Sequence, residues 1–578
     1  MSTYRTHTLD KIEESVIGSR VTLSGWVASI RDHGGILFLD LRDHYGMVQV
    51  VLKDETMLEG VCRETVIMVE GEVIKRAEAD YNEKLKSGKV ELKAEKVTIL
   101  GKSKNILPFE IADSKSVNED TRLKYRYLDL RNPLMQQTLK LRSDLTYDLR
   151  TWMRELDFTE VQTPLLSSSS PEGARDFLVP SRLHKGCFYA LPQAPQQFKQ
   201  LLMVAGMDKY FQIAPCFRDE DARADRSPGE FYQLDMEMSF ATQEDVFEVM
   251  ENILYKAFSK YGKFPISKPP FARIPYKESM LKYGTDKPDL RNPIIIKDLT
   301  KVFEKTEFGA FSGKTVHGFA ISCAGKSRKF YDGLQDYILS QGAKGLAWVA
   351  YQADGTLKGP IIKFISEQEQ ADLIKETGAK IGDDIFLIAD EEKMCNKLCG
   401  LFRTEIAKQL DIIKKDSYEF CWIIDFPMYE LNEETGKIDF CHNPFSMPQG
   451  GLSALTEKQP LDILAYQYDV VVNGIELSSG AVRNHDLDIM VKAFEIAGYD
   501  EETIKQKFSA LYEAFKYGAP PHAGIAPGLD RMLMLLLDVP SIREVVAFPL
   551  NSKAEDPMMK APSAVTEQQL REVHIKIR

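Results

Sequence analysis

The sequence predicts a multi-domain α+β protein. Its 578 residues correspond to three or four domains of ordinary size. The first hundred residues are rich in short strand patterns, and the remainder alternates between helical and strand patterns. A composition of 44% hydrophobic and 28% charged residues is typical of a globular protein with large cores. The formal net charge of −12 excludes a chain covered in basic patches, so local arginines and shape would have to hold any nucleic acid.

Residues 1–104 are predicted to form an OB-fold barrel. Turn signals such as His33-Gly34-Gly35 separate five short strand patterns, at residues 21–28, 36–42, 46–52, 66–73 and 90–97. Five strands in about a hundred residues suit this fold, which binds oligonucleotides on one face, although another small barrel or sandwich fits equally. The segment carries 16 Lys and Arg against 17 Asp and Glu, which favours binding by stacking rather than by charge. Phe38 and Gln49 are expected to point outward from adjacent strands.

A hinge and a second, interrupted domain are predicted to follow. Residues 105–130 are the hinge, with Pro108 and a charged helix near residues 118–129. Residues 131–287 begin the larger domain with a helix at 134–156 and a strand ending at Pro164. Residues 288–415 carry alternating β and α patterns without charged motifs, which indicates an inserted α+β domain. Residues 416–578 complete the larger domain and include a C-terminal extension.

A charged loop lies between two strand patterns at residues 210–214 and 231–240. Its residues 216–230 include three arginines, and hairpin loops are normally far shorter. Arginine suits planar, bidentate recognition of phosphate or carboxylate. Taken alone, the segment favours a solvated charged loop.

The cysteines and hydropathy indicate a reduced, cytoplasmic protein. The eight cysteines are scattered, and Cys395 and Cys399 lack the paired ligands that a metal site needs, so they are interpreted as core or surface thiols. The polar N-terminus does not resemble a signal peptide. No apolar run approaches the roughly 18 residues of a membrane span, so no membrane association is expected.

Three short motifs, in order, resemble those of class II aminoacyl-tRNA synthetases. Residues 158–164, FTEVQTP, resemble motif 1; residues 217–220, FRDE, resemble motif 2; and residues 528–531, GLDR, resemble motif 3. Residues 171–176, PEGARD, 196–199, QQFK, and 480–483, GAVR, are similar to the bacterial-type aspartyl-tRNA synthetases. This resemblance extends from about residue 15 to the C-terminus.

The resemblance implies an aspartate–tRNA ligase with an antiparallel catalytic sheet. Such an enzyme uses ATP and Mg²⁺ to convert L-aspartate into aspartyl-adenylate and transfers the aspartyl group to the 3′-terminal adenosine of tRNA(Asp). Catalysis of the first step is mainly positioning and charge stabilisation at the α-phosphorus. Motif 1 implies a homodimer. The insertion resembles a domain shared with an amidotransferase subunit (GAD-type).

The resemblance also implies roles for individual residues in the catalytic domain. Arg218 would contact the α-phosphate of a bent ATP and Arg531 its γ-phosphate. Lys199 and Arg483 would hold the aspartate side chain, which favours aspartate over lysine or asparagine. The aspartate site would comprise Glu172, Gln196, Lys199, Arg218, Asp235, His442 and Arg483. The ATP site would comprise Arg218, Asp219, Glu220, Glu476, Gly528, Leu529, Asp530 and Arg531. A bulge near Asn473-Gly474 would bring Asp469 and Glu476 together around Mg²⁺.

In the barrel, the resemblance implies that Arg31, Phe38 and Gln49 bind the anticodon, with Phe38 stacking on a base. His33 stands where relatives that charge only tRNA(Asp) commonly carry leucine. A histidine can donate or accept a hydrogen bond at either pyrimidine edge. This favours a non-discriminating enzyme that also charges tRNA(Asn); the alternative is a strictly discriminating enzyme with an exposed turn histidine.

The motif residues also bear on two different classes of protein. A non-catalytic nucleic-acid-binding paralogue would typically lack the motif 2 or motif 3 arginine, and both are present. A class I synthetase is disfavoured because HIGH and KMSKS signatures are absent. The motif 2 loop departs from the family pattern at two positions. Ser227 replaces a glutamine common in the family, and Gly229 is an additional residue, so the ATP contact of that glutamine is not expected here.

Overall fold

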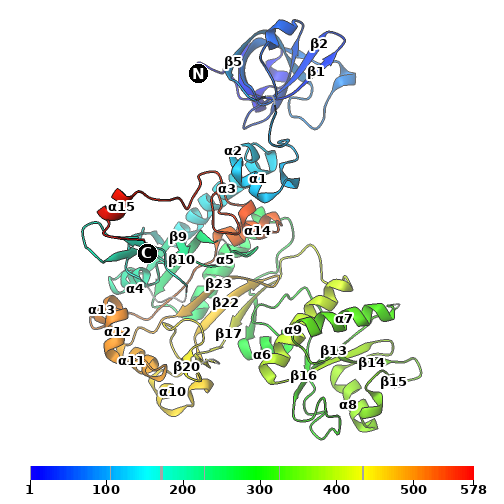
Figure 1. Ribbon diagram of the computed structural model, residues 1–578, viewed down its shortest axis with the longest axis vertical. Coiled ribbons are helices and arrows are strands. Elements are labelled where there is room, and N and C mark those ends of the chain that lie inside the picture. The colour runs from blue at the N-terminus through cyan, green and yellow to red at the C-terminus, as the bar shows by residue number, and fades with distance from the viewer. Residues whose placement is uncertain are drawn as a thin grey trace. The chain divides into compact units, whose positions relative to one another are not determined.

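The computed structural model describes residues 2–104, 106–169, 174–226, 228–324, 326–432 and 435–577. The chain divides into two compact units, Met1–Gln136 and Gln137–Arg578. Figure 1 shows the elements of each unit. The sequence-predicted position of Glu172 and the unusual Ser227 lie outside the described residues.

The first unit contains the predicted OB-fold barrel. Five strands close in the order β1-β2-β3-β5-β4. They are β1 (Arg20–His33), β2 (Ile36–Arg42), β3 (Met47–Leu52), β4 (Val66–Lys75) and β5 (Val90–Gly101). Alternate residues of each strand point inward, as in Val48, Val50 and Leu52, which are fully buried. The fold class predicted for this segment is confirmed.

Short helices follow the barrel and end the first unit. The charged helix predicted near residues 118–129 is two helices, α1 (Glu119–Lys124) and α2 (Arg126–Asp129), because Tyr125 leaves the helical conformation. Asp129 is fully buried and pairs with Arg122 and Arg126. A buried carboxylate needs such partners, and this one links α2 to Arg122 of α1.

The second unit is built on an eight-stranded sheet in the order β11-β17-β22-β23-β24-β10-β9-β6. The sheet is antiparallel except at the pairs β11–β17 and β6–β9, which confirms the predicted antiparallel catalytic sheet. The strands are β6 (Thr159–Glu160), β9 (Lys209–Arg218), β10 (Gly229–Ser239), β11 (Ala272–Pro275), β17 (Phe420–Ile424), β22 (Gln467–Val472), β23 (Ile475–Val482) and β24 (His522–Ile525).

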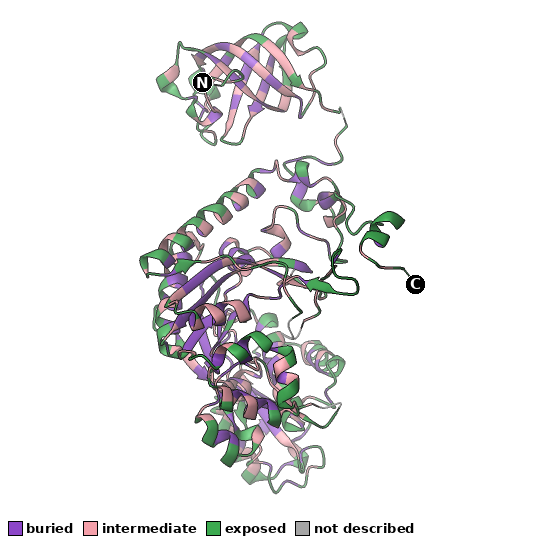
Figure 2. Ribbon diagram, turned by 90° about the vertical axis from the view of Figure 1, so that its left-hand side faces the viewer, coloured by how far each residue is buried: buried purple, intermediate pink, exposed green. Residues whose placement is uncertain are grey.

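Helices cover this sheet and bury its strands, as Figure 2 shows. One core joins the sheet to α3 (Pro133–Glu155), α5 (Gln243–Tyr261) and α14 (Leu529–Leu537). A second core joins α4 (Gln196–Val204) to α11 (Leu487–Ile496), α12 (Glu501–Lys507) and α13 (Ser509–Phe515). Smaller elements complete the unit: β7 (Leu178–Pro180), β8 (Phe188–Ala190), β18 (Phe426–Pro427), β19 (Tyr429–Leu431), β20 (Ile438–Phe440), α10 (Gly451–Glu457), β21 (Leu464–Ala465) and α15 (Glu567–Glu572).

A separate five-stranded sheet is formed by the part of the sequence between α6 (Tyr276–Tyr283) and β17. Its order is β12-β13-β16-β14-β15. Ile385 and Leu387 of β16 pack on one face, with α8, and Phe386 and Ile388 pack on the other, with α7 and α9. The elements are β12 (Lys297–Asp298), β13 (Thr315–Ile321), α7 (Arg328–Ser340), β14 (Ala347–Tyr351), β15 (Leu357–Lys358), α8 (Glu367–Thr377), β16 (Asp384–Asp390) and α9 (Glu392–Gln409).

The strands of motif 1 and motif 2 differ in length from the predicted ones. The motif 1 strand consists only of Thr159 and Glu160, and the following residues to Pro164 are irregular. The motif 2 strands are longer than predicted, because Arg218 at the end of β9 pairs with Gly229 at the start of β10. Gly229 has φ +101, and a Cβ there would lie 3.1 Å from Leu550 Cδ1. The additional glycine therefore permits the backbone turn that begins β10.

The cysteines and the apolarity of the helices complete the description of the fold. All eight cysteines are free thiols, and Cys395 and Cys399 lie buried on α9. Within the described ranges, no cluster of three or more His, Cys, Asp or Glu has the arrangement of a metal site. None of the helices that the structure describes is both long enough and apolar enough to cross a membrane.

Candidate functional site

A cavity of about 540 Å³ opens over the catalytic sheet, beside the motif 2 and motif 3 elements. Most of the residues predicted to bind aspartate or ATP line it, although they come from segments up to 335 positions apart. These are Gln196, Lys199, Arg218, Glu220, Asp235, His442, Glu476, Arg483, Gly528, Asp530 and Arg531. The chain thus brings the predicted aspartate and phosphate residues into one cavity.

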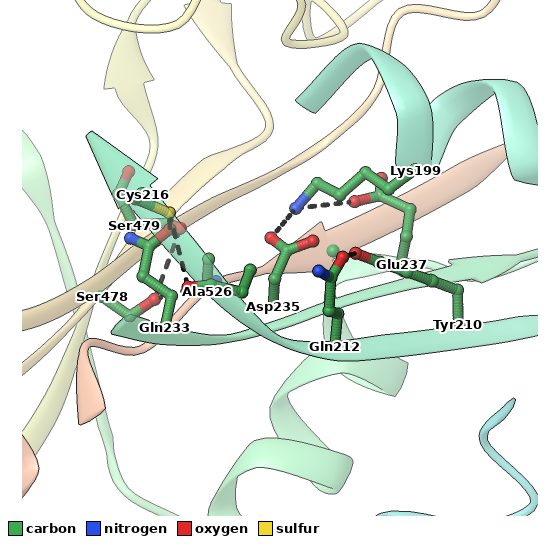
Figure 3. Close-up of polar contacts among 12 residues, drawn as sticks. Lys199, Tyr210, Gln212, Cys216, Gln233, Asp235, Glu237, Ser478, Ser479 and Ala526 are labelled. Carbon is green, nitrogen blue, oxygen red and sulfur yellow. Dashed lines mark hydrogen bonds and ion pairs between the residues drawn. The ribbon is translucent and has the colours of Figure 1, made fainter. Parts of the chain in front are cut away.

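Two cations and two carboxylates form a buried chain at the base of the cavity. Lys199 Nζ, on α4, donates to Asp235 Oδ1 at 2.7 Å and lies 3.2 Å from Glu237 Oε2. Arg483 Nε and Nη2 donate to the two oxygens of Glu237 at 2.8 and 3.1 Å. All four residues are at most 2% exposed. Figure 3 shows Lys199 pointing between the carboxylates of Asp235 and Glu237.

Polar atoms without partners face the same region. Asp235 Oδ2 and Gln196 Nε2 are buried and have no hydrogen-bond partner among the described residues. A buried acceptor and a buried donor left in this way each cost free energy unless a ligand or water satisfies them. An ammonium group would satisfy Asp235, and an oxygen acceptor would satisfy Gln196. An α-amino acid carries both groups.

Neighbouring cations offset the effect of burial fully at Glu237 and only in part at Asp235. Burial raises the pKa of Glu237, but Arg483 and then Lys199 outweigh it and hold that pKa below its usual range. Burial also raises the pKa of Asp235, and there Lys199 compensates only in part. Arg483 has five N–H donors, of which two bond Glu237. Because Arg483 also lines the cavity, it can bind a ligand carboxylate while it remains attached to Glu237.

The two motif arginines lie at another part of the cavity wall. Arg218 has its guanidinium 5.0 Å from the centre of the Phe231 ring, and its buried Nε lacks a partner among the described residues. Arg531 Nη1 donates to the Glu476 carbonyl at 2.6 Å and Arg531 Nε to the Asp225 carbonyl at 3.0 Å. Stacked and braced guanidinium groups are suited to binding phosphate oxygens.

The other residues predicted to bind ATP have different surroundings. Asp530 lines the cavity, but its two oxygens accept from Arg142 Nη1 and the Tyr232 backbone N–H, which ties α14 to α3 and β10. Leu529 is buried in the main core. Glu220 pairs with Arg226 at 2.6 Å. Asp219 is half exposed, lies 3.8 Å from Arg175 and is not part of the cavity wall.

Asp469 and Glu476 share one face of the sheet because of a bulge between Val470 and Val471. Asp469 lies opposite Ser479, three positions from Glu476, so regular alternation would place Glu476 on the other face. The turn needs positive φ at Asn473 (+52) and Gly474 (+81), which these residue types tolerate. Burial and then Glu476 raise the pKa of Asp469, and its Oδ1 lacks a partner among the described residues. Two carboxylates with an unsatisfied buried oxygen fit a Mg²⁺ ion.

His442 also lines the cavity, and burial lowers its pKa. Sequence reasoning missed Glu237, although it lies two positions from Asp235 and therefore on the same face of β10. It also missed Gln233, which lies two positions before Asp235 and accepts a hydrogen bond from Cys216 Sγ at 3.2 Å (Figure 3). Period-two spacing along this strand was the signal that could have found both.

The predicted anticodon residues share the outer face of the barrel. In the strand register, Arg31 of β1 lies opposite Phe38 of β2, and Asp40 of β2 lies opposite Gln49 of β3. Gln49 Nε2 donates to Glu91 at 2.9 Å, a partner that sequence reasoning did not identify. His33 is the last residue of β1, and its ring lies 5.7 Å from that of Phe38, edge to face.

Comparison with known proteins places these features in a family. The model described as "tRNA synthetases class II (D, K and N)" matches residues 118–552, and that described as "OB-fold nucleic acid binding domain" matches residues 21–100. An aspartate–tRNA ligase from Streptomyces avermitilis is 54% identical and aligns over 100% of this chain and 99% of its own length. An aspartate–tRNA(Asp/Asn) ligase from Rickettsia prowazekii is 53% identical and aligns over 100% of this chain and 98% of its own length.

Solved structures share the fold at low sequence identity. Asparaginyl-tRNA synthetase from Pyrococcus horikoshii, complexed with asparaginyl-adenylate, has a TM-score of 0.58 at 18% identity, covering 94% of this chain and 97% of that chain. Aspartyl-tRNA synthetase from Entamoeba histolytica has a TM-score of 0.56 at 20% identity, and the match covers 94% of this chain and 90% of that chain. The matched family model spans most of this chain and contains all three motifs. The chain therefore belongs to the class II tRNA synthetases of the D, K and N group.

Proposed function

We propose that this protein is an aspartate–tRNA ligase that activates L-aspartate with ATP and transfers it to tRNA(Asp) and tRNA(Asn). The observation that carries the proposal is the buried chain of Lys199, Asp235, Glu237 and Arg483 at the base of the cavity. The free oxygen of Asp235 suits the substrate ammonium. Lys199 and Arg483 suit the side-chain carboxylate, and the full-length relatives named as aspartate–tRNA ligases support the same substrate.

The charges at the base of the cavity also explain the choice of aspartate over asparagine. Asparagine is isosteric with aspartate but brings no negative charge to Lys199 and Arg483. The N–H donors of Arg483 that Glu237 does not accept would then face a neutral amide in place of a carboxylate. Sites built around a polar substrate group discriminate strongly when a donor loses its acceptor in this way. Arg218 and Arg531 would bind the phosphates of ATP. The α-carboxylate of aspartate attacks the α-phosphorus, and the bond between that phosphorus and the departing pyrophosphate breaks.

Asp469 and Glu476 would hold Mg²⁺, which when bound would neutralise phosphate charge. The chain's own contribution is to place two carboxylates on one sheet face beside the cavity, through the bulge in β22 and β23. An enzyme that charges tRNA for protein synthesis would act in the cytoplasm.

The test is aspartate-dependent exchange of pyrophosphate into ATP. We expect exchange with aspartate and at least about 10³-fold lower efficiency with asparagine or lysine, as for sites that recognise a polar group. A protein that binds tRNA but shows no exchange with any of the three amino acids would be the non-catalytic alternative.

We propose a homodimer formed through motif 1. Exposed apolar side chains on α3 and in the segment after Pro164 support it: Tyr147 is 71% exposed, Leu165 44% and Leu166 54%. Two-fold contacts between identical surfaces are the commonest oligomer. At micromolar concentration the protein should sediment at twice its chain mass, and Leu166→Glu should shift it toward the monomer. Sedimentation of the unmodified protein as a monomer would contradict the proposal.

The choice of tRNA gives a further prediction. Anticodons for aspartate and asparagine differ only in the third base, and His33 lies beside Phe38 on the proposed anticodon face. Relatives with Asp/Asn names, at 53% identity, support charging of both tRNAs. His33→Leu should lower aspartylation of the tRNA(Asn) transcript about tenfold, the effect of one hydrogen bond, and should leave tRNA(Asp) unchanged.

The matched control for His33→Leu is His7→Leu, which removes a histidine whose ring bonds its neighbour Thr6. It should change neither transcript. If the unmodified enzyme charges tRNA(Asp) alone, the strictly discriminating alternative holds and the role given to His33 is wrong.

A further inference from the structure

A lysine ammonium lies among the carboxylates of the proposed metal site. Lys287 Nζ is 3.0 Å from Asp286 Oδ2 and 3.2 Å from Glu476 Oε2. Its side chain is 39% exposed and that of Glu476 only 28%, so the contact is partly withdrawn from solvent. None of the three synthetase motifs includes Lys287, and Lys287 does not form part of the cavity wall.

The cluster has more negative charge than this lysine balances. Asp469, buried to 4% exposure, adds a third carboxylate that interacts electrostatically with Lys287 and Glu476. Its Oδ1 has no hydrogen-bond partner within the part of the chain that the structure describes. With Asp469 ionised, as it would be beside a bound metal, the three carboxylates and one ammonium leave two negative charges, which is the charge that a single divalent cation neutralises.

The segment that carries Lys287 is anchored by the inserted sheet domain. Arg403, on α9, is 1% exposed and donates to the carbonyls of Ile294, Asn292 and Asp289 at 2.7 to 3.1 Å. On the other side, a Cβ placed on Gly474, in the turn between β22 and β23, would lie 3.3 Å from Asp289 Cβ. The segment is therefore packed between α9 and the turn that leads to Glu476, so the position of Lys287 is constrained from both sides.

We propose that Lys287 is the resident cation of this cluster and that it weakens the binding of a divalent metal to the free enzyme. The inference rests on the proposed function, because it assigns Asp469 and Glu476 to the metal. Lys287 acts by occupying Glu476 and is not a catalytic residue. While its ammonium lies on Glu476, a metal ion must compete with it, and the phosphates of ATP supply the extra negative charge that makes metal binding favourable.

This mechanism separates Lys287 from an ordinary structural ion pair. If Lys287 only held Glu476 in place, removing it would misplace a ligand and weaken metal binding. If it competes with the metal, removing it leaves three carboxylates without a cation and strengthens metal binding. Charge interactions at these distances in a partly buried site are large enough to give a measurable difference in either direction.

The experiment titrates Mn²⁺ into the full-length protein without ATP, aspartate or tRNA and follows free Mn²⁺ by electron paramagnetic resonance. We expect Lys287→Met to bind Mn²⁺ about tenfold or more tightly than the unmodified protein, given the strength of one neighbouring charge. Lys287→Arg, which keeps the charge, should behave as the unmodified protein does. In the double variant Lys287→Met/Asp469→Asn, the tighter binding should be lost.

Lys282→Met is the matched control, because Lys282 pairs with Glu278 on nearby α6 at 2.6 Å and is not part of the cluster. It should leave Mn²⁺ affinity unchanged. If Lys287→Met does not fold, Lys287→Gln replaces it with the same expectation. Unchanged or weaker Mn²⁺ binding in the folded variant overturns the proposal. Because the titration contains no amino acid, this result is independent of whether the protein activates aspartate.

Discussion

Arg531→Ala should lower the rate of aspartyl-adenylate formation by about 10²–10³-fold, the usual effect of removing one preorganised donor to a developing charge. Arg531 lies near the start of α14, where the carbonyls of Glu476 and Asp225 fix two of its N–H groups. This bracing aims the guanidinium into the cavity before ATP arrives. The loss should appear in aspartate-dependent pyrophosphate exchange under saturating ATP.

Arg218→Ala should produce a loss of the same order, because Arg218 is held against Phe231 on the same cavity wall. Arg63→Ala is the control: it removes an arginine that pairs with Glu110 on the surface of the first unit. It should leave exchange unchanged. Binding of aspartate alone should survive in Arg531→Ala, because Arg531 is assigned to the ATP site only. Exchange within threefold of the unmodified enzyme would remove the affected arginine from the phosphate site.

Local patterns predicted the elements whose neighbours in sequence decide their structure. Residues 367–377 have a helical pattern in sequence, and α8 has those bounds, because Ser366 and Glu369 form a capping box and Gly378, with φ +66, ends the helix. The barrel strands followed from the alternation of apolar and polar residues and from the turn signals between them. Tyr125 shows the limit: nothing local marks the break between α1 and α2, since the buried pairing of Asp129 with two arginines determines that segment.

The candidate site was predictable where a motif marked it and not where distant contacts create it. Lys199 and Arg483 were identified by resemblance, but their partner Glu237 was not, because the three residues meet only through α4, β10 and β23. Asp469 and Glu476 required a bulge to share a face, and the Asn473-Gly474 turn was its local sign. Lys287 had no such sign, because Glu476, which it contacts in the folded chain, lies 189 positions away in the sequence.

Burial of Arg483 changes the design of the second experiment. On motif context alone, Arg483→Leu should abolish aspartate binding and leave the fold intact. The structure shows that Arg483 is 2% exposed and is paired with Glu237, which is fully buried. Removing one partner of such a pair costs about 3–5 kcal/mol of stability because the other charge stays buried. The single variant would therefore combine two effects, loss of substrate binding and partial unfolding.

The double variant Arg483→Leu/Glu237→Gln separates them, because it removes both buried charges. We expect its melting temperature to exceed that of Arg483→Leu. Without Arg483, burial would raise the pKa of Glu237 in the folded state, so the single variant should lose stability as pH rises from 5 to 8, and the double variant should not.

In both variants the KM for aspartate should rise by at least about 10²-fold, since a buried, charge-assisted contact is worth 2–5 kcal/mol, while ATP binding is retained. Lys199 would remain as the sole cation at the base of the cavity and cannot replace the planar, two-donor contact that arginine makes with a carboxylate. Calorimetric titration of ATP and of aspartate into the folded double variant makes this comparison directly. If that variant binds aspartate normally, then Arg483 serves to support Glu237 and the side-chain carboxylate must be held elsewhere in the cavity.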